Sequence, residues 1–328
     1  MNVAHSKVLA IDIGGTGSRA RLGQAEVFGP GVRIGAEGIP LGAILDTLVA
    51  GLPADHIDTV SVGTSGLLGL TAPDAALGEV RKRWPRARIV LSSDAVTAAA
   101  AALEGEGGVA ISVGTGVVGL ATNFRDVWRR ADGWGHLLGD EGGGAWIGAR
   151  GLRAALHAHD GRAGGSAALL AEATAQFGHP EGLPWHIYTR ADRAGVLASF
   201  VPAVARAATA HDPVARRIGA DAADAVVETA VALLNEPVPQ RLAFTGGLLN
   251  AHELFVRPLL ERLSERLPSV NVCLTEARPL DGAEILGHAQ KLPEGGRSPF
   301  LTIDTPYRNP TSSQAARYAS REVHEEDL

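Results

Sequence analysis

Short apolar runs alternate with longer amphipathic segments in the first third of the chain. Continuous apolar runs are typical of strands buried on both faces, whereas apolar residues spaced three and four apart indicate a helix with one buried face. Strands are predicted at 8–13, 18–22, 59–62 and 88–91, and helices at 41–51, 75–84 and 94–103. This alternation predicts an α/β unit made of a mixed sheet and helices.

The rest of the chain repeats the strand pattern and places a helical stretch inside it. Strands are predicted at 109–113, 117–122, 241–245 and 270–274. Ala-rich amphipathic helices are predicted at 146–159, 167–177, 193–210 and 213–235, followed by helices at 251–267 and 281–290. The fold class is therefore α/β, with one half of the fold used twice and a helical elaboration in the second copy.

A glycine-rich connection near Gly105 divides the two copies. We expect an N-terminal domain of residues 1–105 and a C-terminal domain of residues 106–292, whose last helix can pack back on the first domain. Residues 293–328 are rich in Pro, Ser, Arg and Glu and lack apolar periodicity, which is typical of a flexible polar tail. The alternative is that this tail wraps the body or a neighbour through residues 300–303 and Tyr307.

Composition and charge exclude several classes of binding partner. The chain has 328 residues, 45% of them hydrophobic, which is enough for two cores. A formal net charge of −6 without a Lys/Arg stripe argues against nucleic acid and anionic membranes. The single cysteine, Cys273, excludes a disulfide framework within one chain and a four-cysteine cluster. Residues 1–7 are polar, and no apolar stretch approaches the roughly 20 residues of a membrane span, so we expect a cytoplasmic protein.

Two predicted strands end in matching loops of glycine and threonine about a hundred residues apart. Glycines let bare backbone N–H groups approach a phosphate that side chains would block. The first loop contains Gly14, Gly15 and Thr16, and the second contains Gly114, Thr115 and Gly116. Two such loops facing each other can bind one nucleoside triphosphate; the alternative is two ordinary glycine-rich hairpins.

Two aspartates stand at the ends of predicted strands. Asp12 occupies a position where a purely structural strand would carry an apolar residue, and its carboxylate can orient Mg²⁺ or the waters of that ion. Asp94 follows the strand at 88–91 and opens an Ala-rich helix, which is also the position of a helix N-cap. At the carboxyl end of a strand Asp94 can instead take the proton of a hydroxyl during phosphoryl transfer. We expect either role, or both.

The segment from Gly133 to Gly144 is dense in glycine and acidic residues. Trp134 offers a flat apolar face of the kind on which sugars stack; the alternative is that it anchors a core. Asp140 can accept hydrogen bonds from vicinal hydroxyls, or favour the positive end of the following helix. His136 could donate to a phosphate or a sugar, but such a histidine is more often a hydrogen-bonded structural residue, so it is not a catalytic candidate.

A third strand-to-glycine turn lies at Gly246 and Gly247. It leaves room for adenine or ribose against the backbone, or it is a simple βα turn.

Together these motifs resemble the N-acetylglucosamine kinase group of the BadF/BadG/BcrA/BcrD-type ATPase family. The resemblance spans residues 7–290 and rests mainly on the Gly-Trp-Gly-His and Gly-Asp-Glu-Gly block within residues 133–142. It implies two duplicated actin-like, ribonuclease H-like domains around a nucleotide cleft. It also implies an ATP- and Mg²⁺-dependent kinase that phosphorylates the 6-hydroxyl of an amino sugar, N-acetylglucosamine first.

The resemblance also implies roles for the residues of these motifs. Asp94 would be the catalytic base, and Asp12 would help to place Mg²⁺. The sugar would contact Gly133, Trp134, Asp140 and Asp94, the ATP phosphates would contact the two glycine and threonine loops, and adenosine would lie at Gly246 and Gly247.

The first domain departs from the family pattern. Members of the family commonly carry a sugar-binding Asn, and the corresponding stretch here, residues 35–42, has none. Glu37 is a substitute acceptor, and Ser65 and Gly66 could line the same wall. The acceptor could therefore be glucosamine or N-acetylmuramic acid.

Two other classes compete with a kinase. An ATPase that activates electron transfer needs more cysteines than one chain supplies, and a sugar sensor with this fold would bind without catalysis. We expect a homodimer formed through the Ala-rich helices.

Overall fold

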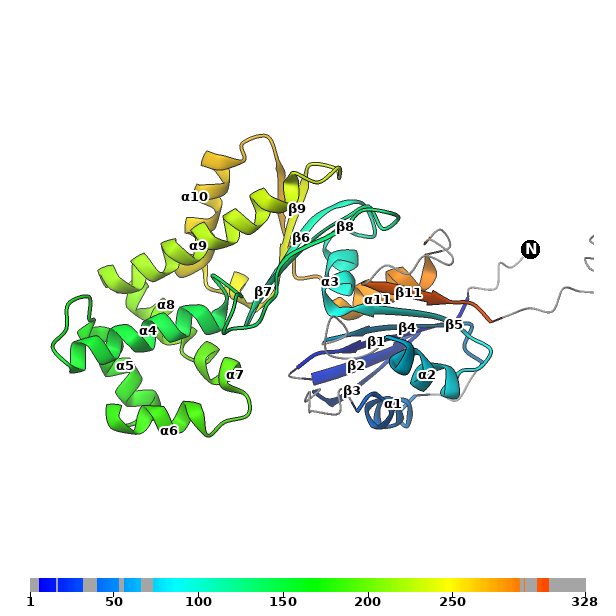
Figure 1. The fold of residues 1–328 in the computed structure, drawn as a ribbon, viewed down its shortest axis with the longest axis horizontal. Helices are drawn as coiled ribbons and strands as arrows, with labels where there is room; N and C mark the ends of the chain where they lie inside the picture. The colour runs from blue at the N-terminus through cyan, green and yellow to red at the C-terminus, as the bar shows by residue number, and fades with distance from the viewer. Residues whose placement is uncertain are drawn as a thin grey trace, which may run out of the picture.

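The computed structural model describes residues 6–15, 17–31, 40–52, 56–65, 73–289, 292 and 300–306, arranged in two lobes (Figure 1). The first lobe is built on a six-stranded sheet with the order β11-β5-β4-β1-β2-β3. Its strands are β1 (Val8–Ile13), β2 (Gly17–Leu22), β3 (Ala25–Pro30), β4 (Thr59–Thr64), β5 (Arg88–Ser93) and β11 (Leu301–Asp304). Strands β1, β4 and β5 run parallel, and the others pair antiparallel.

Helices cover both faces of this sheet. They are α1 (Leu41–Val49), α2 (Pro73–Arg83), α3 (Asp94–Ala102) and α11 (Pro279–His288). Leu9 and Ile11 of β1 are buried in one core with apolar residues of α1 and α2, whereas Ala10 packs on Leu280 and Ala283 of α11. This alternation follows from the two-residue repeat of a strand, which turns successive side chains to opposite faces.

The second lobe repeats the topology of the first. Its five-stranded sheet has the order β10-β9-β6-β7-β8. The strands are β6 (Gly108–Val113), β7 (Val117–Thr122), β8 (Trp128–Asp132), β9 (Arg241–Thr245) and β10 (Asn271–Leu274). Each sheet has a meander of three antiparallel strands followed by two parallel strands beside the first strand of the meander. The duplicated α/β fold predicted from the sequence is confirmed.

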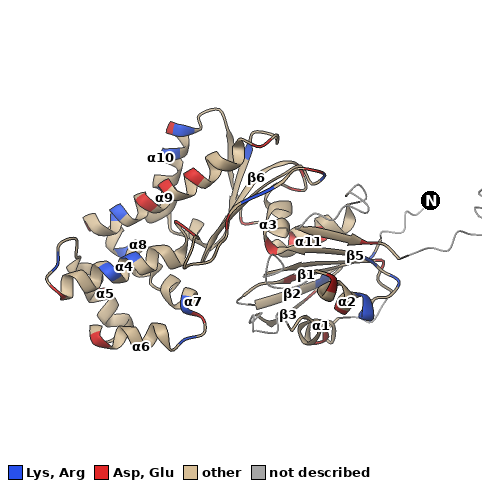
Figure 2. Ribbon diagram, in the orientation of Figure 1, with Lys and Arg blue, Asp and Glu red and all other residues tan. Residues whose placement is uncertain are grey.

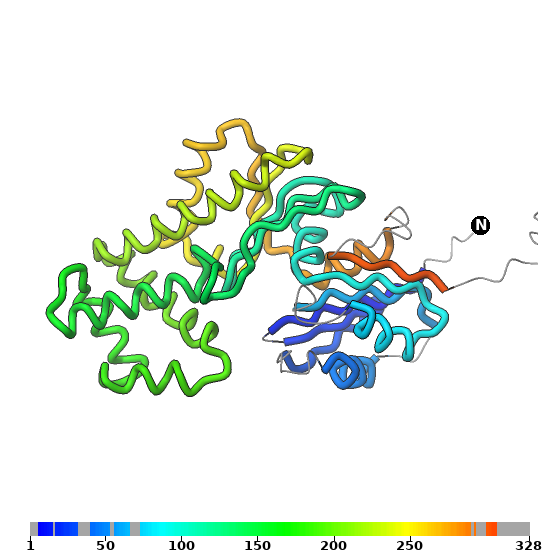
Figure 3. Tube along the Cα trace, viewed as in Figure 1, coloured from blue at the N-terminus to red at the C-terminus, as the bar shows by residue number. Residues whose placement is uncertain are grey.

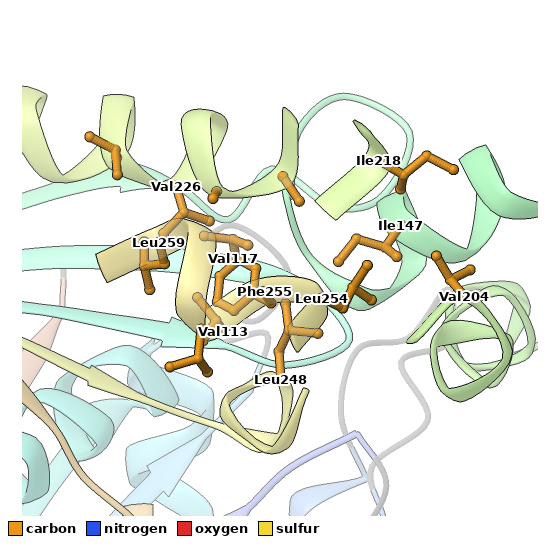
Figure 4. Packing of buried hydrophobic residues seen from close by; sticks show 14 of the residues in the cluster. Val113, Val117, Ile147, Val204, Ile218, Val226, Leu248, Leu254, Phe255 and Leu259 are labelled. Atoms are coloured by element: carbon orange, nitrogen blue, oxygen red, sulfur yellow. The ribbon is translucent and has the colours of Figure 1, made fainter. Parts of the chain in front are cut away.

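The helical elaboration lies between β8 and β9 and extends beyond the sheet (Figure 1). It comprises α4 (Gly144–His159), α5 (Ala167–Phe177), η1 (Pro180–Gly182), α6 (Leu183–Tyr188), α7 (Arg193–Ala198), α8 (Val201–Thr209) and α9 (Pro213–Leu234). After β9 come η2 (Gly247–Asn250), η3 (His252–Val256) and α10 (Arg257–Arg266). Figure 4 shows Val113 and Val117 of the sheet meeting Val226 of α9 and Phe255 of η3 in one continuous core.

Several element predictions need correction. The single helix predicted at 193–210 is wrong, because α7 ends at Ala198 and α8 begins at Val201. The ring of Pro202 would clash with the carbonyl of Ala198, four residues earlier, if the helix continued. The helix predicted at 251–267 begins instead with the π-helical turn η3. Strands β3 and β8 were not predicted.

The segment after residue 293 also differs from a plain polar tail. Residues 301–304 form β11, which pairs with β5 at the edge of the first sheet. The alternative in which this segment packs on the body therefore describes residues 300–304, whereas Tyr307 lies outside the described residues. Helix α11 packs on β1, β4 and α3 of the first lobe. The domain limits at residues 105 and 292 stay a prediction.

The surface has no single charge character. Figure 2 shows basic and acidic residues interspersed over both lobes. Among the described residues, no helix is both long enough and apolar enough to span a membrane.

Candidate active site

Asp94 lies at the carboxyl end of the parallel strands of the first sheet. It is the first residue of α3 and follows β5 directly. Ser65 Oγ donates to Asp94 Oδ2 at 2.7 Å, and the Ala95 N–H donates to Oδ1 at 2.9 Å. Ser93 holds the N-cap position, so the N-cap interpretation of Asp94 is wrong. The Asp94 carboxylate stands at the sheet edge where open α/β sheets bind ligands.

Asp12 lies near Asp94 at the same edge, since β1 pairs with β4 and β4 with β5. It is only 9% exposed. The pKa of Asp12 is raised from its usual 3.8 to about 6, chiefly by burial and also by the charge of Asp94, whereas the charge of Arg19 opposes the rise. Arg19 is the cross-strand partner of Asp12 on β2. Two interacting carboxylates in one partly desolvated site favour a cation between them.

The carboxylates of this site suit Mg²⁺ better than a metal ion whose ligands all come from the protein. Within the described parts of the chain, no group of three or more His, Cys, Asp or Glu side chains could hold a metal ion. Mg²⁺ commonly binds proteins through one or two carboxylates, with waters and substrate phosphates completing its shell. The carboxylate of Asp12 meets that requirement.

The two glycine and threonine loops are equivalent in the two lobes. Each links the first and second strands of its sheet with three residues, 14–16 and 114–116. In each, the N–H of the first glycine donates at 2.9 Å to the carbonyl of a later glycine, Gly17 in one and Gly116 in the other. A Cβ added at Gly15 or Gly114 would meet nothing within 4 Å. Both loops thus expose backbone to open space, whereas Thr16 lies outside the described residues.

The first turn of α4 holds the second loop. The N–H groups of Gly144 and Ala145 donate to the carbonyls of Gly114 and Thr115, each at 2.8 Å. The carbonyls of Gly114 and Thr115 are therefore hydrogen-bonded to the start of α4, and these bonds hold the loop in place.

Asp140 lies against this second loop. A Cβ on Gly116 would collide with the Asp140 carboxylate, which would then have to move. Burial raises the pKa of Asp140, and the charge of Asp132 adds to the rise, whereas hydrogen bonds from the backbone of Val117 and Gly135 oppose it. Asp140 thus joins the Gly133–Gly144 segment to the loop at 114–116.

Asp132, the last residue of β8, was not among the predicted site residues. Its Oδ1 accepts from the N–H of Asp140 at 2.7 Å and its Oδ2 accepts from the N–H of Glu141 at 3.0 Å. Asp132 has a φ of 58°, and Asp140 has a φ of 56°. An acid directly before the Gly-Trp-Gly run was the only sequence signal, and it does not reveal a bond to residues eight and nine positions later.

Trp134 is 64% exposed, so the interpretation as a core anchor is wrong. The guanidinium of Arg130 lies 4.3 Å from the centre of its indole ring. Gly133 precedes it with a φ of 75°. This loop therefore presents an aromatic ring at the surface of the second lobe.

A cleft of about 550 Å³ adjoins the third glycine turn. Gly246 and Gly247 line it from the second lobe, and Arg19 lines it from the first. The wall continues through residues 274–279, where the chain returns to the first lobe. The volume falls within the usual range for ligand pockets. Gly246 has a φ of 115°, and a Cβ there would collide with the carbonyl of Val113.

The residues predicted to line the sugar wall are only partly described by the structure. Ser65 contacts Asp94, whereas Glu37 and Gly66 lie outside the described residues. Arg19 and Arg278 line the cleft and were not predicted, because they come from segments far apart in the sequence.

Known proteins resemble this chain over most of its length. A family model described as the BadF/BadG/BcrA/BcrD ATPase family matches residues 9–284. The N-acetylmuramic acid/N-acetylglucosamine kinase of Clostridium acetobutylicum is 27% identical over 251 residues, 73% of this chain and 80% of that protein. The N-acetyl-D-glucosamine kinase of Dictyostelium discoideum is 28% identical over 206 residues, 60% of this chain and 64% of that protein.

A solved structure shares the fold. It is a candidate N-acetylglucosamine kinase from Chromobacterium violaceum, with a TM-score of 0.66 and 24% identity. The match covers 87% of this chain and 99% of that chain.

Proposed function

Because the chain belongs to the BadF/BadG/BcrA/BcrD ATPase family, we propose that it is an ATP-dependent kinase that phosphorylates the 6-hydroxyl of an amino sugar. The observation that carries this proposal is the pair of interacting carboxylates, Asp12 and Asp94, at the sheet edge of the first lobe. N-acetylglucosamine is the first acceptor to test, since the names of both curated relatives include it. Glucosamine and N-acetylmuramic acid are the alternatives.

In this proposal the two glycine and threonine loops bind the ATP phosphates. Backbone N–H groups at Gly15 and Gly116 and the side chains of Thr16 and Thr115 supply the donors. The N–H groups of Gly14 and Gly114 close the loops instead, and these two glycines leave room for the phosphates. Adenosine occupies the cleft beside Gly246 and Gly247, whose volume of about 550 Å³ supports this assignment. Asp12 holds Mg²⁺, which when bound neutralises phosphate charge.

Asp94 is the proposed base. The sugar O6 forms a bond to the γ-phosphorus, the bond from that phosphorus to the β,γ-bridging oxygen breaks, and the O6 proton passes to the Asp94 carboxylate. The transition state of phosphoryl transfer is loose, so that catalysis depends mainly on positioning the hydroxyl and neutralising charge. The bond from Ser65 fixes one carboxylate oxygen and leaves it a further lone pair to accept the proton.

The sugar is proposed to bind at the Gly133–Gly144 segment. The exposed ring of Trp134 supports stacking against the apolar face of a pyranose. Gly133 and Asp140 supply the polar contacts of this subsite, and Asp140 keeps acceptor capacity beyond its backbone bonds. The homodimer expected from the Ala-rich helices stays a prediction, which the molar mass in solution tests.

The experiment is ADP release from Mg·ATP with a panel of sugars: glucosamine, N-acetylglucosamine, N-acetylmuramic acid, N-acetylmannosamine and glucose. The position of the phosphate in the product is located by NMR. Turnover confined to one or two amino sugars, with phosphate on O6, supports the proposal. ATP hydrolysis indifferent to every sugar would instead favour a non-kinase ATPase.

A further inference from the structure

Strand β11 lies along the outer edge of β5, the strand that leads into Asp94 (Figure 3). The two strands pair antiparallel over the whole length of β11. At the end nearest the candidate site, the Ser93 N–H donates to the Phe300 carbonyl at 3.0 Å. Ser93 is the N-cap of α3, so the ladder between the strands reaches the residue immediately before Asp94.

A single arginine fixes the far end of β11. Arg81 of α2 donates to Asp304 Oδ2 through Nη2 at 2.6 Å and through Nε at 3.0 Å. The same guanidinium donates through Nη1 to the carbonyl of Ala87 at 2.7 Å, just before β5 begins. Arg81 therefore ties the end of β11 to the start of β5. Arginine forms such multiple bonds because its donors lie in a rigid planar fork.

Apolar packing adds a third link, to α3. Leu301 is 2% exposed and belongs to a buried cluster with Val96 and Ala99 of α3 and Val90 of β5. Strand β11 therefore contacts both elements that meet at Asp94. Without β11, β5 would be the edge strand of the sheet, and edge strands carry unpaired backbone groups.

We propose that β11 is a positioning element for the Asp94 carboxylate, and that Asp304 is the residue that anchors it. This inference rests on the proposed function of Asp94. The family model ends at residue 284, so that β11 lies outside the matched part of the chain. The Phe300–Ser93 bond holds the end of β5 beside Asp94, and the Arg81–Asp304 pair fixes the opposite end of β11 to the start of β5. Small displacements of a reacting group are costly, since about 1 Å can cost about 100-fold in rate.

The test compares three variants of the full chain. Asp304→Ala removes the anchor, and Asp304→Glu keeps the charge for a conservative rescue. Asp46→Ala is the matched control, because Asp46 of α1 pairs at 2.7 Å with Arg83, which lies on α2 as Arg81 does. Helix α1 packs on β2 and β3, at the opposite edge of the sheet from β11. Each protein is measured for sugar-dependent ADP release and for hydrogen exchange in the segment that joins β5 to α3.

We expect Asp304→Ala to lower kcat about tenfold with little change in KM for ATP, because the carboxylate is displaced while the nucleotide site is intact. Hydrogen exchange at 88–97 should rise in this variant. Asp304→Glu should recover most of the loss in kcat, and Asp46→Ala should change neither measurement.

Two results would overturn the inference. Unchanged exchange at 88–97 in Asp304→Ala would mean that the pair does not hold β5, and raised exchange with unchanged kcat would reduce β11 to a structural strand. If the unaltered protein shows no sugar-dependent turnover, the proposed function fails and the positioning role falls with it. The exchange measurement then still decides whether β11 holds β5.

Discussion

Asp94 is the residue on which the proposed chemistry depends most directly. We expect Asp94→Asn to lower kcat by about 100-fold or more while sugar binding persists, because the amide keeps the shape of the side chain but cannot accept the proton. Steady-state kinetics give the loss in kcat, and calorimetry of sugar binding gives the control. Turnover equal to that of the unaltered protein would remove Asp94 as the base.

The buried carboxylate of Asp12 destabilises the folded protein when it is ionised, so this effect depends on pH. Its pKa in the folded protein, about 6, lies above the usual 3.8, chiefly because of burial. The folded state therefore holds this proton more tightly than the unfolded state, and the resulting stability is lost as the pH rises from about 4 through about 6. The rise in pKa corresponds to on the order of 3 kcal/mol.

Asp12→Asn should remove this cost. In the ligand-free protein, the variant should be more stable than the original at about pH 8, and the difference should shrink toward about pH 4. Urea unfolding at several pH values measures it. A difference in unfolding free energy that does not change with pH would show that the Asp12 carboxyl is not the source.

At the scale of single elements, the turn after β9 offers a matched pair of glycines. A Cβ on Gly246 would collide with the carbonyl of Val113, and the φ of 115° strains any other residue, whereas a Cβ on Gly247 meets nothing within 4 Å. We expect Gly246→Ala to lower the melting temperature. Gly247→Ala should leave it unchanged but raise KM for ATP, because the methyl group projects into the cleft. Equal effects on stability would contradict the assignment.

Sequence patterns identified the elements whose residues are buried in a regular way. The runs that form β1 and β6 are apolar and end in glycine, so that both strands and their loops were predictable. Strand β3 is half exposed and β8 contains two arginines, and such edge strands carry no apolar signature. Asp94 was identified by its chemistry and position. Asp132 was not, because its role depends on a loop that returns to it in space.

At the scale of the whole molecule, the cleft between lobes predicts closure. The chain crosses between the lobes twice, between α3 and β6 and between β10 and α11. Arg278 lies at the second crossing and donates to Glu26 of β3 at 3.0 Å. We expect the lobes to approach when sugar and a non-hydrolysable ATP analogue bind together, because phosphoryl transfer requires exclusion of water. Small-angle scattering should show a smaller radius of gyration with both ligands than with either alone; equal radii would count against closure.

The two crossings also set an order of completion during protein synthesis. All strands of the second lobe lie within residues 108–274, whereas the first lobe also needs α11 and β11, which follow at residues 279–304. On the ribosome, the lobe that is begun first is therefore finished last. Until α11 and β11 emerge, the Ala10 face and the outer edge of β5 stay uncovered, and exposed apolar faces and strand edges of this kind invite aggregation. Until residues 279–304 have been made, the nascent first lobe therefore exposes the kind of surface that chaperones bind.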